Sequence, residues 1–93
     1  NRPQLEKLCE ENKISYLALF GSFARGEGDE KSDIDLLVEF TEKPSLLRHV
    51  GIEHDFSEQL FANRKVDLVN KGTLNKYIRP FVLNDLVTLY EKK

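Results

Sequence analysis

The spacing of apolar residues changes near residue 13, from a helical period to a continuous apolar run. Segment 4–12 follows Pro3, a residue suited to the first turn of a helix, and its apolar face is formed by Leu5, Leu8 and Cys9. The run 14–20 is apolar almost throughout, which indicates a buried strand. The chain is therefore expected to begin with a helix followed by a strand.

A second apolar run, residues 34–40, indicates another strand, and alternate positions on one face of it are Ile34, Leu36, Val38 and Phe40. Helices are expected to cover that face. After a break at 41–44, Ser45 is suited to cap a helix. Helical spacing is shown by Leu46, Leu47, Val50, Phe56, Leu60 and Phe61. Gly51 costs about 1 kcal/mol relative to alanine, so an irregularity is expected near it.

The last third of the chain contains two short strand patterns around a polar and helical stretch. Residues 66–69 form an apolar strand pattern interrupted by Asp67, and 86–90 can add an edge strand. A short helix is outlined between them by Ile78, Phe81, Val82 and Leu86. Strands alternating with helices predict an α/β (α+β) fold, with helices packed against a short mixed sheet. This pattern leaves the strand order open.

The first candidate ligand-binding residues follow the first predicted strand, in the stretch Gly21-Ser22-Phe23-Ala24-Arg25-Gly26. The Gly-Ser step is small enough for the backbone to approach a ligand closely. If residues 23–26 begin a short helix, its free amides and the Ser22 hydroxyl form an anion site, with Arg25 as a nearby cation. The stretch therefore favours a phosphate ligand.

Two carboxylates follow this stretch, since Asp33 and Asp35 stand two residues apart at the entrance to the second strand. In a strand both would project from one face and repel each other. A divalent cation removes that repulsion, and oxygen ligands suit Mg²⁺, which substrate phosphates normally complete. Asp-x-Asp alone is a weak signal. The combination of Asp-x-Asp with a candidate phosphate-binding stretch, all within the fifteen residues 21–35, is a far more specific sign of a metal and phosphate site.

These motifs resemble a known family. Gly21-Ser22-Phe23-Ala24-Arg25-Gly26 and Ser32-Asp33-Ile34-Asp35-Leu36-Leu37-Val38 look like the signature of the DNA polymerase beta superfamily of nucleotidyltransferases, especially its minimal, MntA-like branch. Lys65-Val66-Asp67-Leu68-Val69 matches the family's third motif. The resemblance implies that two Mg²⁺ ions are held by the catalytic acids Asp33, Asp35 and Asp67. It also implies that the nucleotide is bound by Gly21, Ser22, Arg25 and Ser32.

The resemblance further implies transfer of a nucleoside monophosphate, AMP from ATP, to a hydroxyl. MntA-like proteins are antitoxins that AMPylate a tyrosine of a helical HEPN-domain toxin. A domain of 93 residues has little surface left to enclose a second substrate, so a separate helical protein is expected to supply the hydroxyl. Three alternatives stay open: an antitoxin that acts by contact alone, transfer to a small molecule such as an aminoglycoside, and transfer to RNA ends.

Length, composition and charge predict the number of domains, the class of partner and the cellular location. The length predicts one domain spanning 1–93, and 32% charged with 40% hydrophobic residues is typical of soluble globular proteins. A net charge of −2 argues against a protein that grips nucleic acid. The single Cys9 cannot form an internal disulfide and no apolar run is as long as a membrane span, so a cytoplasmic location is expected. Homo-oligomerisation is left open, and His49 and His54, five residues apart, are expected to be packing or surface residues.

Overall fold

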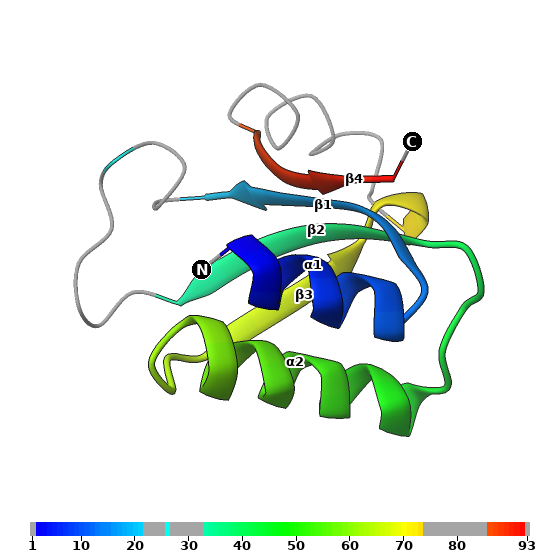
Figure 1. The fold of residues 1–93 in the computed structure, drawn as a ribbon, viewed down its shortest axis with the longest axis horizontal. Coiled ribbons are helices and arrows are strands. Elements are labelled where there is room, and N and C mark those ends of the chain that lie inside the picture. Colours follow the sequence, from blue (N-terminus) through cyan, green and yellow to red (C-terminus); the bar gives the residue numbers. More distant parts are fainter. Residues whose placement is uncertain (1, 22–25, 27–32, 74–85, 93) are drawn as a thin grey trace.

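The computed structural model describes residues 2–21, 26, 33–73 and 86–92. Its helices are α1 (Arg2–Glu11), α2 (Leu46–Leu60) and the short 3₁₀ helix η1 (Lys71–Thr73), and its strands are β1 (Ile14–Phe20), β2 (Ile34–Phe40), β3 (Val66–Asn70) and β4 (Val87–Glu91). The four strands form one sheet in the order β3-β2-β1-β4, and α1 and α2 lie on the same side of it (Figure 1). Strand β1 is antiparallel to β2 and β4, whereas β2 and β3 are parallel. The predicted fold class, a mixed sheet with packed helices, is confirmed.

The first helix and strand confirm the predicted elements. The apolar face of α1 is buried, because Leu5, Leu8 and Cys9 all lie in the core cluster. Burial raises the pKa of the Cys9 thiol to about 12, with smaller contributions from Glu10 and Glu6. The thiol is therefore neutral at physiological pH and serves as a small core side chain.

Helix α2 begins where the sequence predicts. The Ser45 side chain accepts a hydrogen bond from the Arg48 backbone amide at 3.1 Å, which satisfies one of the free donors of the first turn. The helix then runs without interruption past Gly51, so the expected irregularity there is wrong. Tertiary packing outweighs the small propensity cost of one glycine.

The buried face of α2 differs from the face that apolar spacing alone outlines. Ile52 and Phe56 are almost fully buried, whereas Leu46 and Leu47 are 82% and 85% exposed, and Val50 is also exposed. At 3.6 residues per turn, Leu47 and Val50 point away from the Ile52 and Phe56 side. We call Leu46, Leu47 and Val50 the α2 apolar patch.

Strand β2 lies between two neighbours and is buried on both faces. Ile34, Leu36 and Val38 join the helix-side core, as alternation predicted. Leu37, which points to the opposite face, is also fully buried. The predicted edge strand appears as β4, shifted by one residue, and it pairs with β1. The helices predicted near 23–26 and 78–86 fall almost wholly outside the described residues.

No helix in the described part of the chain has the length and apolar character needed to cross a bilayer.

Candidate active site

Gly21 follows the last residue of β1 and has a backbone conformation that glycine favours, with φ of +79°. A Cβ atom at this position would lie 2.5 Å from Oδ2 of Asp35, well inside van der Waals contact. Two separate features therefore favour glycine at position 21: the positive φ angle and the lack of space for a side chain beside the Asp35 carboxylate. The closeness shown here is to Asp35, and the approach of this backbone to a phosphate ligand stays a prediction.

Asp35 and Asp67 are brought together by the parallel pairing of β2 and β3, in which they are register partners. Their chain neighbours Ile34, Leu36, Val66 and Leu68 are buried in the helix-side core. Since side chains alternate along a strand, both aspartates face the side of the sheet opposite the helices. Neighbouring strands lie about 4.8 Å apart, so the two carboxylates occupy adjacent positions on one face.

Asp33 lies immediately before β2 and is more exposed than the other two acids. Its Oδ2 lies 3.9 Å from Nζ of Lys65, the residue two positions before Asp67. An ion pair this long between exposed groups contributes little to stability, so Asp33 can leave it at small cost. Lys65 was not among the predicted site residues, because its closeness to Asp33 depends on the β2 and β3 pairing.

A cation site here would consist of carboxylate oxygens alone. No three histidine, cysteine, aspartate or glutamate side chains are grouped closely enough to hold a metal ion within residues 2–21, 26, 33–73 and 86–92. The two register-paired acids and the side-chain-free space at Gly21 nevertheless suit a hard cation that also contacts phosphate oxygens. The chemistry of the predicted donors Asp33, Asp35 and Asp67 therefore fits Mg²⁺.

The remaining predicted nucleotide-binding residues, Ser22, Arg25 and Ser32, lie outside the described residues. The structure therefore brings together Gly21, Asp35 and Asp67 and places Asp33 beside Lys65. The roles of all seven residues stay predictions.

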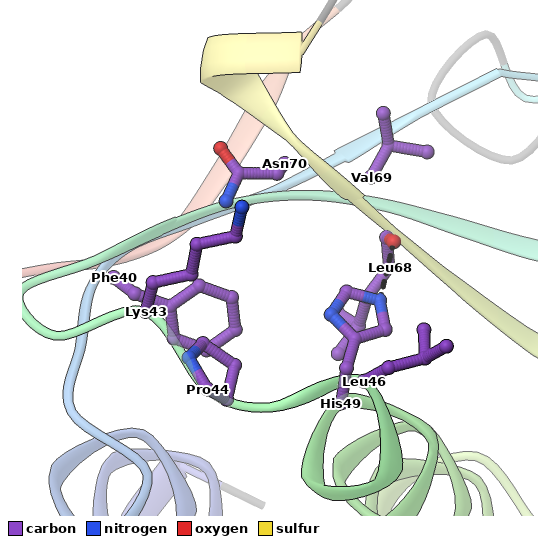
Figure 2. A pocket seen from close by; sticks show the side chains of 8 residues that line it. All are labelled: Phe40, Lys43, Pro44, Leu46, His49, Leu68, Val69 and Asn70. Carbon is purple, nitrogen blue, oxygen red and sulfur yellow. Dashed lines mark hydrogen bonds between the residues drawn. The ribbon is translucent and has the colours of Figure 1, made fainter.

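A cleft of about 550 Å³ lies at the other end of the sheet, where β2 and β3 finish (Figure 2). It is lined by Phe40, Lys43, Pro44, Leu46, His49, Leu68, Val69 and Asn70. Phe40 is five residues along β2 from Asp35, about 16 Å away at 3.3 Å per residue. None of the three acids lines this cleft, although Leu68, the residue directly after Asp67, does.

The two histidines have the ordinary roles that the sequence predicted. His49 is partly buried, contacts the Phe40 ring and is hydrogen-bonded through Nε2 to the Leu68 carbonyl oxygen. His54 is exposed on the outer side of α2 and pairs with Glu58. His49 thus contacts the residue directly after Asp67, whereas the contact of His54 stays within α2.

The fold, a four-stranded mixed sheet with two helices, is that of a nucleotidyltransferase domain. Residues 3–93 match the sequence profile described as Polymerase beta, Nucleotidyltransferase, and the chain belongs to this family. It is thus a nucleotidyltransferase, and the resemblance read from its motifs is confirmed.

Relatives agree with this assignment. A Methanocaldococcus jannaschii protein, named provisionally as a protein adenylyltransferase, is 47% identical over 81 residues, which cover 86% of this chain and 81% of that protein. The protein adenylyltransferase MntA of Thermococcus cleftensis is 42% identical over 82 residues, which cover 88% of this chain and 81% of that protein. The chain therefore resembles the MntA-like branch specifically.

A solved structure of a tri-AMPylated Shewanella oneidensis HEPN toxin in complex with MNT antitoxin has the same fold as this chain. The TM-score is 0.70, and the match covers 98% of this chain and 70% of the other. Its sequence identity of 20% means that this likeness supports the fold alone.

Proposed function

We propose that this protein transfers AMP from ATP to a tyrosine hydroxyl of a helical HEPN-type partner and acts as the antitoxin of that partner. The observation that carries the proposal is the pairing of Asp35 with Asp67 beside the side-chain-free turn at Gly21. Adjacent carboxylates next to a close backbone approach can hold a metal and a triphosphate together.

In this proposal each acid has its own task. Asp33 and Asp35 would hold two Mg²⁺ ions against the nucleotide phosphates, and Asp67 would be a further ligand of the ion that serves the attacking hydroxyl. When bound, Mg²⁺ makes that hydroxyl a better nucleophile and neutralises the leaving pyrophosphate. Gly21 lets the backbone approach the phosphates, with Ser22, Arg25 and Ser32 as further phosphate contacts. The protein thus contributes placement and electrostatics.

A protein acceptor is supported by two further observations. Relatives of this chain are named protein adenylyltransferases, and a protein with the same fold is found with an AMPylated HEPN toxin. The α2 apolar patch leaves large side chains exposed on the protein surface, as expected of a region that a protein partner covers. A separate chain can therefore bring the hydroxyl that a domain of 93 residues does not enclose.

The proposal is tested by incubating the protein and the protein encoded beside it with Mg²⁺ and ATP labelled at the α-phosphate. We expect label on a tyrosine of the partner. Asp67→Asn should abolish this labelling but retain ATP binding, because its carboxylate serves the hydroxyl. Glu42→Gln is the control and should label normally, because Glu42 is exposed and follows the end of β2 opposite to Asp35.

Each contrary result has its own meaning. Inhibition of the partner without any labelling would indicate an antitoxin that acts by contact. Normal labelling by Asp67→Asn would contradict the role given to this acid. Label on RNA ends or on a small molecule, with none on protein, would overturn the proposed acceptor.

A further inference from the structure

Strand β3 carries Asp67 and, among the described residues, has a sheet neighbour on one side only, since the strand order is β3-β2-β1-β4. The Lys65 carbonyl accepts a hydrogen bond from the Ile34 amide at 2.8 Å, so Lys65 directs its backbone groups toward β2. In a parallel strand these directions alternate from one residue to the next. The amide and carbonyl of Leu68 therefore point away from β2, toward the open edge.

Two side chains of α2 bind both of these outward groups. Oε2 of Glu53 accepts a hydrogen bond from the Leu68 amide at 2.7 Å. Nε2 of His49 lies 3.0 Å from the Leu68 carbonyl oxygen, and the dashed line in Figure 2 marks this contact. Because a carbonyl oxygen can only accept, Nε2 of His49 carries the hydrogen.

The two side chains lie close together on α2. They are one helical turn apart, His49 Nε2 lies 3.8 Å from Glu53 Oε2, and each side chain is only 24% exposed. A hydrogen bond in which one partner is charged is stronger than one between neutral groups. We call His49 and Glu53 the β3 clamp.

We propose that the β3 clamp positions Asp67 for nucleotidyl transfer. Asp67 directly precedes Leu68, and its carbonyl belongs to the same peptide unit as the Leu68 amide that Glu53 binds. Because peptide units are planar, fixing this one limits the backbone rotation that directs the Asp67 side chain. His49 and Glu53 are thus positioning residues, and their role rests on the function proposed above.

The same helix provides a matched control. His54 and Glu58 have the same spacing and lie 3.1 Å apart, but both are well exposed. In the described part of the structure they make no hydrogen bond to β3. Substitutions in this pair remove the same chemical groups from α2 without releasing Leu68.

The experiment compares Glu53→Ala and His49→Ala with Glu58→Ala and His54→Ala in the full chain. Amide hydrogen exchange is measured by NMR, and transfer from labelled ATP is measured with the partner. Glu53→Ala should speed exchange at Leu68 by about tenfold or more, since a charged hydrogen bond is lost. It should lower kcat by about tenfold or more while KM for ATP changes less than about twofold.

Glu53→Gln keeps an oxygen that can accept from Leu68 and should recover most of the activity. It also provides a folded variant if Glu53→Ala proves unstable. The control substitutions should leave both measurements unchanged.

Transfer by Glu53→Ala at the level of Glu58→Ala would overturn the positioning role. A parallel loss of ATP binding and activity, with no recovery in Glu53→Gln, would also overturn it, because general destabilisation would then explain the result. The exchange measurement needs no activity. Equal exchange at Leu68 in all variants would therefore refute the β3 clamp even if the wild-type protein transferred nothing, a result that would separately count against the proposed function.

Discussion

Gly21 shows how a single residue can determine the shape of the candidate site. Its φ of +79° and the 2.5 Å between its virtual Cβ and Oδ2 of Asp35 both exclude larger residues. Gly26 has a similar φ of +75°, but no atom of the other described residues lies within 4 Å of the place its Cβ would take. Comparing substitutions at the two glycines therefore distinguishes the free-energy cost of the backbone angle from the cost of crowding the Asp35 carboxylate.

We predict that Gly21→Ala destabilises the protein by more than Gly26→Ala and abolishes transfer. A left-handed backbone costs a non-glycine residue about 1–2 kcal/mol, and only Gly21→Ala adds the contact with Asp35. Urea unfolding measures the stability of each variant, and transfer from labelled ATP measures activity. Equal stability losses and equal activities in the two variants would show that the space beside Asp35 is not required.

At the scale of elements, α2 connects β2 to β3 and allows the two strands to run parallel. Ser45 caps the N-terminus of the helix, and the buried side chains of Ile52 and Phe56 pack it against the core. His49 and Glu53 then reach the open edge of β3 from the same helix. Changes to α2 should therefore act on stability and, through the β3 clamp, on the site.

Gly51 offers a test of α2 that does not touch the site. A Cβ at Gly51 would meet nothing within 4 Å, and the residue lies inside a regular helix. Gly51→Ala should therefore stabilise the protein by about 0.5–1 kcal/mol, because alanine loses less backbone freedom on folding. Urea unfolding monitored by circular dichroism measures the change. Destabilisation would mean that α2 needs the glycine at this position.

At the scale of the whole molecule, the sheet collects acids that are far apart in the chain. Asp35 and Asp67 become neighbours because α2 carries the chain from β2 back to the start of β3 (Figure 1). Gly21 arrives from the other side, since β1 is antiparallel to β2 and Phe20 is the register partner of Asp35. Ligand binding at this junction should therefore stabilise the fold as a whole.

We predict that Mg²⁺ and ATP together raise the melting temperature, whereas ATP with EDTA does not. A ligand bound only by the folded state adds about 2.7 kcal/mol at one hundred times its dissociation constant. Replacing both Asp33 and Asp35 by Asn should remove the dependence on metal. Differential scanning fluorimetry measures the shift, with Glu42→Gln as the control. A metal-dependent shift that survives in the double variant would contradict the proposed ligands.

Much of the fold is determined by the sequence through local physical rules. The apolar period of α1, the apolar runs of β1 and β2 and the cap at Ser45 all give elements close to those predicted. The motif residues likewise indicate the family, because each motif is a short and continuous stretch of the chain. Period and capping depend on neighbours in the chain, so they can be read from it directly.

Only the tertiary structure decides what depends on residues distant in the chain. The strand order β3-β2-β1-β4 makes Asp35 and Asp67 register partners and places Lys65 beside Asp33. Within the described part of the chain it also leaves one edge of β3 without a strand, which lets His49 and Glu53 bind Leu68. Apolar spacing did not show that Leu46 and Leu47 would stay exposed, because that outcome depends on where α2 meets the sheet. Strand pairing and helix packing bring together residues that are far apart in the sequence. These contacts therefore cannot be read from the sequence alone.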